Sequence, residues 1–308
     1  MSLSGPEPVS GTTRRVLSPP EDARLRSSVD SNGQVSHVSA IGMGFASEEL
    51  QFLLRSETRL NILSALAQRA PLETDVLEET LDTSRRTLTR TLRQLEDRRL
   101  VEETEDGYRL TSFGETQAAS FREWLRRDEL ARAFRPVLGR LEANLLGFDI
   151  ERLRGATLTV ADESHPYAPL DRTLALRAEA DRIRELAPSV ERRSVEQLVD
   201  RIDAGEELAV EIIMSAATAR AAQSRQTYQD ALAAVAAADG VTQYVHPGGF
   251  PFVLAVMDET VVLGVADDSG PTAVLETTDD TVREWAESTL DEYCEEARPL
   301  AAERDANT

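Results

Sequence analysis

The stretch SRRTLTRTLRQLEDRRLVEETEDGYRLT, residues 84–111, decides the fold of the N-terminal part of the chain. Three leucines in its first half repeat at four- and three-residue spacing, Leu88, Leu92 and Leu95. This spacing, behind Ser84 as an N-cap, predicts a helix over 85–99. In the second half a Glu-Asp-Gly turn lies between two short strand-like runs, which predicts a β-hairpin over 101–111.

Two further helices are expected before this stretch. Apolar residues recur at helical spacing from residue 46, with Ser56 as a plausible N-cap inside the run. Thr74 is expected to cap a short helix that ends near Asp82. Three helices and a hairpin within about 65 residues are the order of a winged helix-turn-helix, here spanning 46–113.

The rest of the chain predicts two more parts. Residues 114–147 carry a long apolar stripe, which indicates a connecting helix, kinked at Pro136, that joins domains or pairs in a dimer. Residues 155–298 alternate strand-like and helical runs, which indicates a mixed α/β domain with one sheet, so the whole chain is classed as α+β.

The elements of this second domain follow from period and length. Strands are expected at 157–161, 207–214, 241–245, 252–257, 260–266 and 272–277, with a tight antiparallel hairpin at Asp258-Glu259. Helices are expected at 171–187, 193–204, 216–238 and 279–297.

Both ends of the chain lack apolar periodicity. Residues 1–45 are rich in Ser, Pro and Gly, so we expect a disordered tail, and a second short tail over 299–308. Met43 lies immediately before the first periodic segment, so translation starting there is a second hypothesis.

The charge of the chain is strongly acidic. It has 34 Lys+Arg against 55 Asp+Glu, a net charge of −21, and no lysine at all. Such a chain repels phosphate backbones, which at first argues against nucleic acid as a partner. The lysine-free, acidic composition instead indicates a salt-loaded, haloarchaeal cytoplasm in which charge is screened within about 3 Å at 1 M salt. No apolar run predicts a membrane span or secretory signal, so we expect a cytoplasmic protein.

The predicted third helix inverts this charge. Residues 83–99 hold six arginines and two carboxylates, a local charge of +4. Arginine suits guanine edges and phosphates, and a recognition helix contacts DNA with its N-terminal half. The alternative is an ordinary solvated helix face. The predicted DNA contacts on this helix are Ser84, Arg85, Arg86, Thr87, Thr89, Arg90 and Arg93.

Two segments resemble known families. Residues 53–114 resemble the archaeal winged-helix regulators of the ArsR/MarR/TrmB type. The pattern positions of that resemblance are Arg86, Thr87, Arg90, Leu92, Leu95, Leu100, Tyr108, Leu110, Thr111 and Gly114. The segments HPYAPLDR (165–172) and FPFVLAVMDETVVLGVADDSGP (250–271), with the closing helix, are similar to archaeal regulators with a FilR1-type, methanogenesis regulatory protein-like domain. These resemblances imply a DNA-binding transcriptional regulator.

The hairpin departs from the pattern of a DNA-gripping wing. Its only cation is Arg109, among four carboxylates between positions 102 and 106. A wing that grips phosphate or the minor groove is expected to be basic. Arg109 is therefore a candidate contact, and the alternative is a winged-helix module that binds proteins of the transcription machinery.

Metal and catalytic motifs are missing from the sequence. Cys294 is the one cysteine and is expected to be a packing residue, and the three histidines are scattered, so no metal site is predicted. No nucleophile, phosphate-binding or zinc-protease motif is present, and no cofactor is expected. An enzyme with its active site in the loop 162–172 is the weaker alternative.

The second domain offers one speculative ligand site. Loops at strand ends gather ligands in α/β domains, and the loop 162–172 contributes His165, Tyr167 and Arg172. A second loop that starts at His246 could close against it, although the alternative is that both loops only shape turns. The sequence thus predicts a homodimer that reads a pseudo-palindromic operator in double-stranded DNA, with a possible small-molecule effector.

Overall fold

The computed structural model describes residues 48–223, 226–267 and 270–300. The chain divides after Glu57 into two units. In the first unit, helix α1 spans Glu48–Leu54. The predicted tail over 1–45, the start at Met43 and most of the second tail lie outside the described residues.

The next elements are the helices and hairpin that the sequence predicts. They are α2 (Glu57–Gln68), α3 (Thr74–Thr80), α4 (Arg85–Asp97), β1 (Val101–Thr104) and β2 (Gly107–Leu110). Their apolar faces are buried at Ile62, Leu63, Leu66, Leu77, Leu88, Leu92, Leu95 and Leu100. Ser84 caps α4 as predicted, but Thr74 is the first residue of α3, and the N-cap position belongs to Glu73.

The long connecting helix is shorter than predicted. Helix α5 spans Ser112–Ala133, and a separate short helix α6 spans Arg135–Leu138. The prediction of helix through residue 147 is wrong, because Pro136 cannot donate a backbone hydrogen bond and starts a new turn instead of kinking the old one. The residues after Leu138 approach the C-terminal core, where Leu141 and Leu145 pack.

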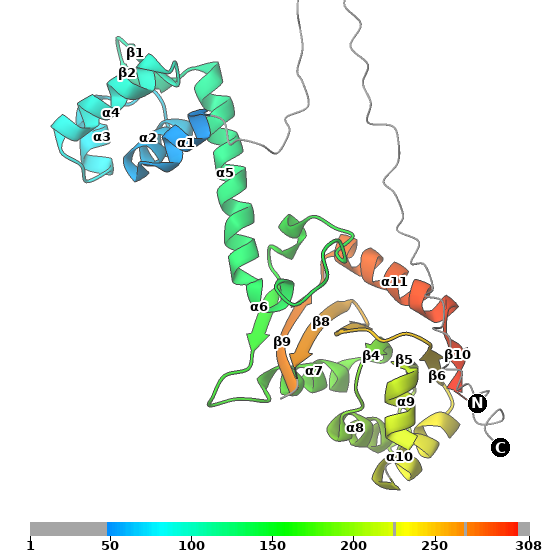
Figure 1. Ribbon diagram of the computed structural model, residues 1–308. Coiled ribbons are helices and arrows are strands. Elements are labelled where there is room, and N and C mark those ends of the chain that lie inside the picture. The colour runs from blue at the N-terminus through cyan, green and yellow to red at the C-terminus, as the bar shows by residue number, and fades with distance from the viewer. Residues whose placement is uncertain (1–47, 224–225, 268–269, 301–308) are drawn as a thin grey trace, which may run out of the picture. The chain divides into compact units, whose positions relative to one another are not determined.

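The C-terminal part contains a single eight-stranded mixed sheet, as predicted (Figure 1). Its strands are β3 (Thr157–Val160), β4 (Arg182–Ala187), β5 (Ala209–Ser215), β6 (Val241–His246), β7 (Phe252–Met257), β8 (Thr260–Asp267), β9 (Gly270–Thr277) and β10 (Arg298–Pro299). The order across the sheet is β10-β6-β5-β4-β7-β8-β9-β3. Strands β4, β5 and β6 are parallel, and the other pairs are antiparallel. The hairpin predicted at Asp258-Glu259 joins β7 to β8.

Helices cover both faces of this sheet. One face packs under α7 (Ala168–Glu179), α8 (Arg192–Asp203), α9 (Ala216–Gln223) and α10 (Gln226–Ala237). The other packs under α11 (Asp280–Glu295), α6 and the 3-10 helix η1 (Ile150–Leu153). Side chains alternate between the two faces, so that Ile212 joins one core and its neighbour Ile213 the other.

The sequence prediction misses a central strand. The predicted helix 171–187 is helix α7 followed by β4, which lies between β5 and β7. The run RIRELA consists mostly of good helix formers, but pairing on both sides makes it a strand. The predicted helix 216–238 is likewise two helices, and the short strand β10 and η1 were not predicted.

No helix among the described residues is long and apolar enough to cross a membrane.

Candidate nucleic-acid interface

Helix α4 presents a stripe of arginines opposite its buried leucines. Ser84 starts the helix, since its hydroxyl oxygen accepts a hydrogen bond from the backbone N–H of Thr87 at 3.4 Å. Arg86, Arg90 and Arg93 follow at four- and three-residue spacing and are exposed. We call these three residues the arginine stripe. Among the described residues, no ion pair joins Arg86 or Arg90 to a carboxylate.

Arg85 lies apart from the arginine stripe. Its guanidinium forms an ion pair with Asp75 of α3 at 2.8 Å, and its backbone N–H donates to Glu78 at 2.8 Å. Both side chains of the ion pair are largely exposed, so the pair contributes little to stability. These contacts join α3 to the start of α4.

The predicted hydroxyl contacts serve the helix itself. The Ser84 hydroxyl lies 3.0 Å from the Thr87 hydroxyl, next to the cap hydrogen bond. Thr87 and Thr89 are half-buried. These groups lie at the start of α4, where the backbone N–H groups of Arg85 and Thr87 already donate to Glu78 and Ser84.

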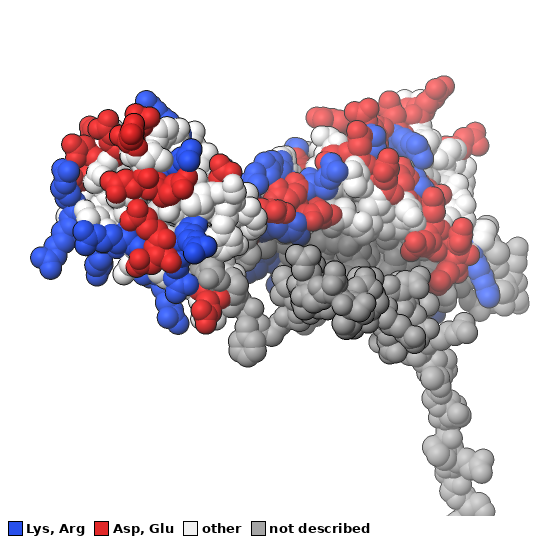
Figure 2. All heavy atoms as spheres, turned by 90° about the horizontal axis from the view of Figure 1, so that it is seen from above, with Lys and Arg blue, Asp and Glu red and all other residues white. Residues whose placement is uncertain are grey.

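Carboxylates surround the first turn of α4. Asp75, Glu78, Glu79 and Asp82 line a shallow hollow beside Ser84 and Arg85. Figure 2 shows acidic and basic side chains next to each other over this part of the surface. At the other end of the helix, burial and the nearby Glu103 and Asp97 raise the pKa of Glu96. The arginine stripe is therefore a narrow basic strip in acidic surroundings.

The wing offers no unpaired cation to a phosphate. Arg109 lies opposite Glu102 in the β1–β2 register, and the two form an ion pair at 2.7 Å. The strand pairing thus holds Arg109 within the hairpin, a pairing that the sequence prediction had not included.

The predicted ligand residues are not brought together. His165 and Tyr167 are exposed on the loop before α7, where the Asp162 carboxylate accepts hydrogen bonds from the backbone N–H groups of Ser164 and His165. The Ser164 hydroxyl donates to the same carboxylate. This hydrogen bond contributes most to the lowered pKa of Asp162, and the two backbone hydrogen bonds add to it. Arg172 points to β9, where it binds both carboxylate oxygens of Glu276 at 2.6 Å.

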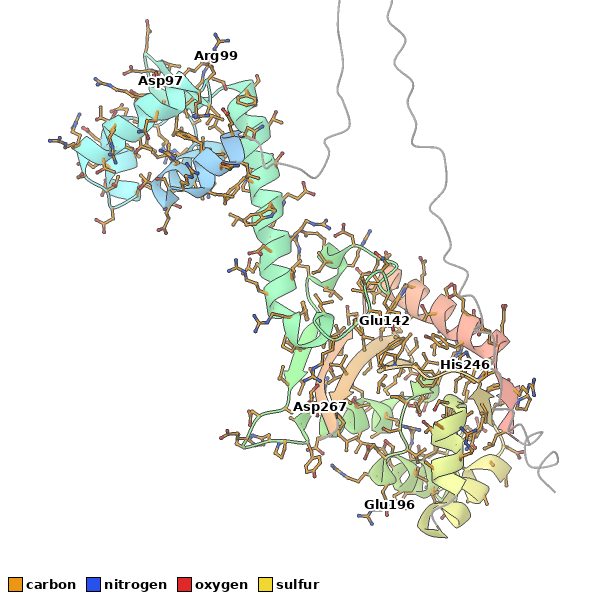
Figure 3. All side chains as sticks on the ribbon, viewed as in Figure 1. Asp97, Arg99, Glu142, Glu196, His246 and Asp267 are labelled. Carbon is orange, nitrogen blue, oxygen red and sulfur yellow. The ribbon has the colours of Figure 1, made fainter. Side chains whose placement is uncertain are left out.

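His246 lies at the opposite side of the sheet. It is buried next to Tyr293 of α11, with ring centroids 5.1 Å apart, and its Nε2 lies 3.3 Å from Glu296 (Figure 3). Six strand spacings separate β6 from β3, roughly 29 Å at about 4.8 Å each. His246 itself is therefore far from the loop 162–172, and the loop that it starts ends at β7, with β8 and β9 still between β7 and β3.

Cys294 lies in the packed side of α11. Burial raises the pKa of its thiol, and the carboxylate of Glu211 adds to the rise. A reactive cysteine needs the opposite shift.

Two segments of the chain match family models. Residues 166–296 match the model described as methanogenesis regulatory protein FilR1, middle domain, and residues 47–133 match the model described as HVO_A0261 N-terminal domain. Comparison with curated proteins gives no match.

Solved structures resemble the chain only loosely. TrmBL2, an archaeal chromatin protein, is 14% identical and matches over 83% of this chain and all of its own, with a TM-score of 0.37. The methyltransferase SibL is 15% identical over 65% of this chain and 64% of its own, with a TM-score of 0.22. An IclR-family regulator from Rhodococcus sp. is 16% identical over 83% and 96%, with a TM-score of 0.18. TM-scores this low do not establish a shared fold, so the likeness that stands is that of residues 166–296 to the FilR1 middle domain and of residues 47–133 to the HVO_A0261 N-terminal domain.

Proposed function

We propose that the chain is an archaeal transcriptional regulator that binds double-stranded DNA through helix α4. The observation that carries the proposal is the arginine stripe, which lies on the third helix of a helix-turn-helix in a chain of net charge −21. The match of residues 166–296 to a regulatory protein supports regulation as the role. The absence of lysine supports a haloarchaeal source.

In this proposal a dimer places two α4 helices in successive major grooves, about 34 Å apart. Arg86 and Arg90 contact guanine edges and Arg93 contacts phosphate, while Thr89 touches a thymine methyl group. Ser84 and Thr87 present the helix start to a phosphate. Arg85 supports α4 through Asp75, and Arg109 stays paired with Glu102.

The second copy binds along α5. Phe113, Trp124 and Leu125 are each 44% exposed on this helix. Phe113 and Trp124 are eleven residues apart, which is three helical turns, so they share one face. Leu125 lies beside this face, about 100° around the helix from Trp124. Large exposed apolar side chains grouped in this way are typical of a self-association surface.

The experiment is a gel shift with the double variant Arg86→Ala/Arg90→Ala. Chromatin immunoprecipitation first supplies the intergenic fragments that the wild-type protein binds. We expect the double variant to bind such a fragment at least about 10-fold more weakly in molar KCl, because each guanine contact contributes about 1–3 kcal/mol. The matched control is Arg126→Ala/Arg192→Ala, which removes the same charge from exposed positions outside α4.

Both variants should keep the circular dichroism spectrum and melting temperature of the wild type. Unchanged binding by Arg86→Ala/Arg90→Ala, or an equal loss in the control, contradicts the proposed role of α4.

The acidic wing favours a second candidate, a winged-helix module that binds the transcription machinery through protein contacts. In the hairpin, Arg109 is paired and the neighbouring carboxylates are left to face solvent or a partner. Chromatin immunoprecipitation separates the two functions. Discrete intergenic peaks support the regulator, whereas a signal at promoters in general supports the module.

A further inference from the structure

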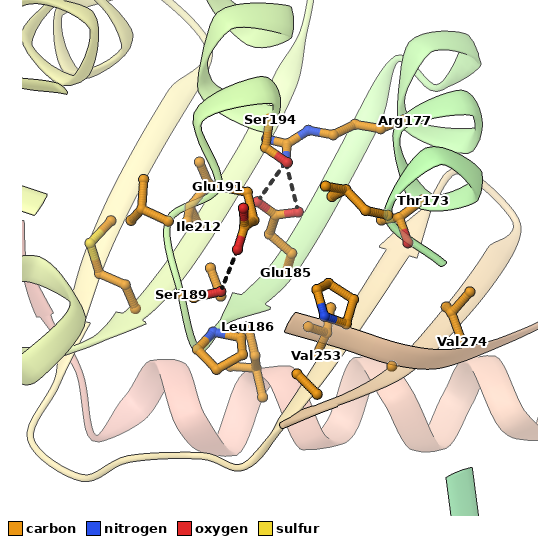
Figure 4. A pocket seen from close by; sticks show the side chains of 18 of the residues that line it. Thr173, Arg177, Glu185, Leu186, Ser189, Glu191, Ser194, Ile212, Val253 and Val274 are labelled. Carbon is orange, nitrogen blue, oxygen red and sulfur yellow. Dashed lines mark hydrogen bonds and ion pairs between the residues drawn. The ribbon is translucent and has the colours of Figure 1, made fainter. Parts of the chain in front are cut away.

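A small pocket lies inside the C-terminal part, on the sheet face that α7, α8 and α10 cover. Its cavity volume is about 130 Å³. Side chains from α7, α8, α10 and the six strands β4 to β9 line it, most of them apolar (Figure 4). It includes none of the four residues that the sequence proposed for a ligand.

The pocket exists because two positions on the sheet carry little or no side chain. Ala187 ends β4 opposite Met214 of β5, and Gly264 on β8 lies between Val253 of β7 and Val274 of β9. A Cβ atom at Gly264 would lie 3.3 Å from the Cβ of Val253, so a larger side chain would fill this end of the pocket. The space next to Ala187 and Gly264 therefore stays unfilled.

Of the described side chains that line the pocket, two have buried polar atoms without a partner: Nε of Arg177, whose Nη1 binds Glu185, and both amide atoms of Gln243. Gln243 on β6 is 6% exposed, and neither its amide nitrogen nor its amide oxygen has a hydrogen-bond partner among the described residues. A buried amide in this state is costly, since burial removes its hydrogen bonds to water. Such a group in a cavity indicates a missing partner.

Of the three described charged side chains that line the pocket, Arg177 and Glu185 neutralise each other, while the half-buried Glu191 is 3.5 Å from the Ser189 hydroxyl. Arg177 of α7 reaches Glu185 of β4, with the two at 3.1 Å, and both side chains are buried (Figure 4). Glu185, Ile212 and Gln243 are paired in one row across β4, β5 and β6. The amide of Gln243 thus lies about two strand spacings, roughly 10 Å, from an ion pair without net charge.

We propose that this pocket binds a small, uncharged, largely apolar molecule that carries an amide or lactam edge. The side-chain amide of Gln243 offers a donor and an acceptor side by side, and an amide or lactam supplies the matching acceptor and donor. An anionic ligand would be desolvated without a counter-ion, because Arg177 is already paired with Glu185 and Glu191 adds a like charge. A cavity of about 150 Å³ holds benzene, so a volume of about 130 Å³ corresponds to a single six-membered ring.

Binding at this site stands independently of DNA. An effect of the bound molecule on DNA affinity is a separate claim, which rests on the proposed function. Such an effect requires the molecule to bind the two states of the regulator differently. The experiment therefore measures ligand binding and uses no DNA.

The probes are 2-pyridone, which carries a lactam edge, and benzene, which has a similar size and no such edge. The side-chain amide signal of Gln243 in the full chain is assigned by its loss in Gln243→Met. We expect 2-pyridone to shift this signal saturably in the millimolar range, and to bind Gln243→Met at least tenfold more weakly. Benzene should bind both proteins equally, since only the lactam edge needs the amide. Thr242→Val, on the exposed opposite side of the same strand, is the control and should bind 2-pyridone like the wild type.

Thermal unfolding without ligand provides a second measurement. Methionine matches glutamine in length but has no amide, so we expect the melting temperature of Gln243→Met to equal or exceed that of the wild type. A lower melting temperature would show that the amide already has a partner and would overturn the proposal. Failure of 2-pyridone to bind, or equal binding to wild type and Gln243→Met, would also overturn it. A failed gel shift with Arg86→Ala/Arg90→Ala would leave these outcomes unchanged.

Discussion

Gly114 and Thr111 join the wing to helix α5 at a point where backbones meet closely. Thr111 caps α5, since its hydroxyl accepts from the N–H of Gly114 at 3.0 Å and donates to the carbonyl of Arg99 at 2.5 Å. A Cβ atom at position 114 would lie 1.8 Å from the carbonyl oxygen of Leu100. The T-x-x-G pattern thus has a physical cause, a cap followed by a contact that admits only glycine.

Gly114→Ala should therefore destabilise the protein although alanine is the better helix former. Overpacking costs about 1–3 kcal/mol or more, against a gain of about 1 kcal/mol in helix propensity. We expect a net loss of about 1–2 kcal/mol in the free energy of unfolding, measured by urea denaturation. The control is Gly249→Ala, where nothing lies within 4 Å of the added methyl group. Equal stability of the two variants would mean that the wing does not approach α5 as described.

Arg184 is the most heavily paired cation of the C-terminal sheet. It forms ion pairs with Glu211 of β5 and with Glu287 and Asp291 of α11, and its side chain is 13% exposed. Burial alone lowers the pKa of this guanidinium, but the hydrogen bonds to Asp291, Glu287 and Glu211 outweigh it and leave the pKa above its usual value. Arg184 thereby attaches α11 to the sheet.

Replacing Arg184 with methionine should leave three carboxylates facing one another. Loss of one partner of a buried ion pair costs about 3–5 kcal/mol, and we expect about 2–4 kcal/mol at pH 7 because these carboxylates are partly exposed. In the variant the three negatively charged carboxylates repel one another. The difference from wild type should therefore shrink as the pH falls toward 4 and they bind protons. Thermal unfolding between pH 4 and 7 measures this, with Arg192→Met, from an exposed pair, as the near-neutral control.

At the scale of the element, residue spacing in the sequence predicts those helices and strands whose buried face is set by their own residues alone. Helix α4 and its cap were predicted because Ser84 and the leucine spacing act locally. Strands β7 and β8 were predicted because their sequences are short and mostly apolar and a tight turn joins them. These signals place most of the fold without knowledge of distant contacts.

Strand β4 and the pocket depend on distant parts of the chain. Arg184 and Glu185 look like helix surface in sequence, and only β5, β7 and α11 make their strand conformation stable. In the same way, the row from Glu185 to Gln243 joins residues 58 positions apart. No local period reveals that these side chains share one face.

Helix α5 carries a prediction of its own, because its exposed apolar stripe is proposed to bind a second copy. Trp124 stacks on the buried Phe121 at a centroid distance of 5.8 Å, which holds it in place on the surface. Trp124→Gln/Leu125→Gln should convert a dimer into a monomer of 33.9 kDa, measured by light scattering. Arg126→Gln is the control, as position 126 lies about 200° around the helix from Trp124. A monomeric wild type, or a double variant that remains dimeric, contradicts this surface.

At the scale of the whole molecule, the acidic charge alters what DNA binding can depend on. All 34 cations are arginine, and many of those in the C-terminal part are paired with carboxylates. The arginine stripe is thus a small fraction of the cationic charge. Two carboxylates, Glu79 and Asp82, belong to the same helix-turn-helix motif. Phosphates that approach α4 also approach these carboxylates, and cations must be taken up between them.

This uptake leads to a prediction for the salt dependence of binding. If each of the six stripe arginines of a dimer displaced one counterion from the DNA, whether it contacts a base or a phosphate, log K would fall with log [KCl] at a slope of about −5. Cations taken up near the carboxylates oppose that release, so we expect a clearly shallower slope, or affinity that rises with KCl. Filter binding between about 0.5 and 3 M KCl measures the slope. At these ionic strengths charges are screened within about 3–4 Å. Glu79→Gln/Asp82→Asn should make it steeper, because two of the carboxylates that hold cations are removed while the arginine stripe stays intact. A wild-type slope near −5 that the double variant leaves unchanged would show that the acidic surface takes no part in DNA binding.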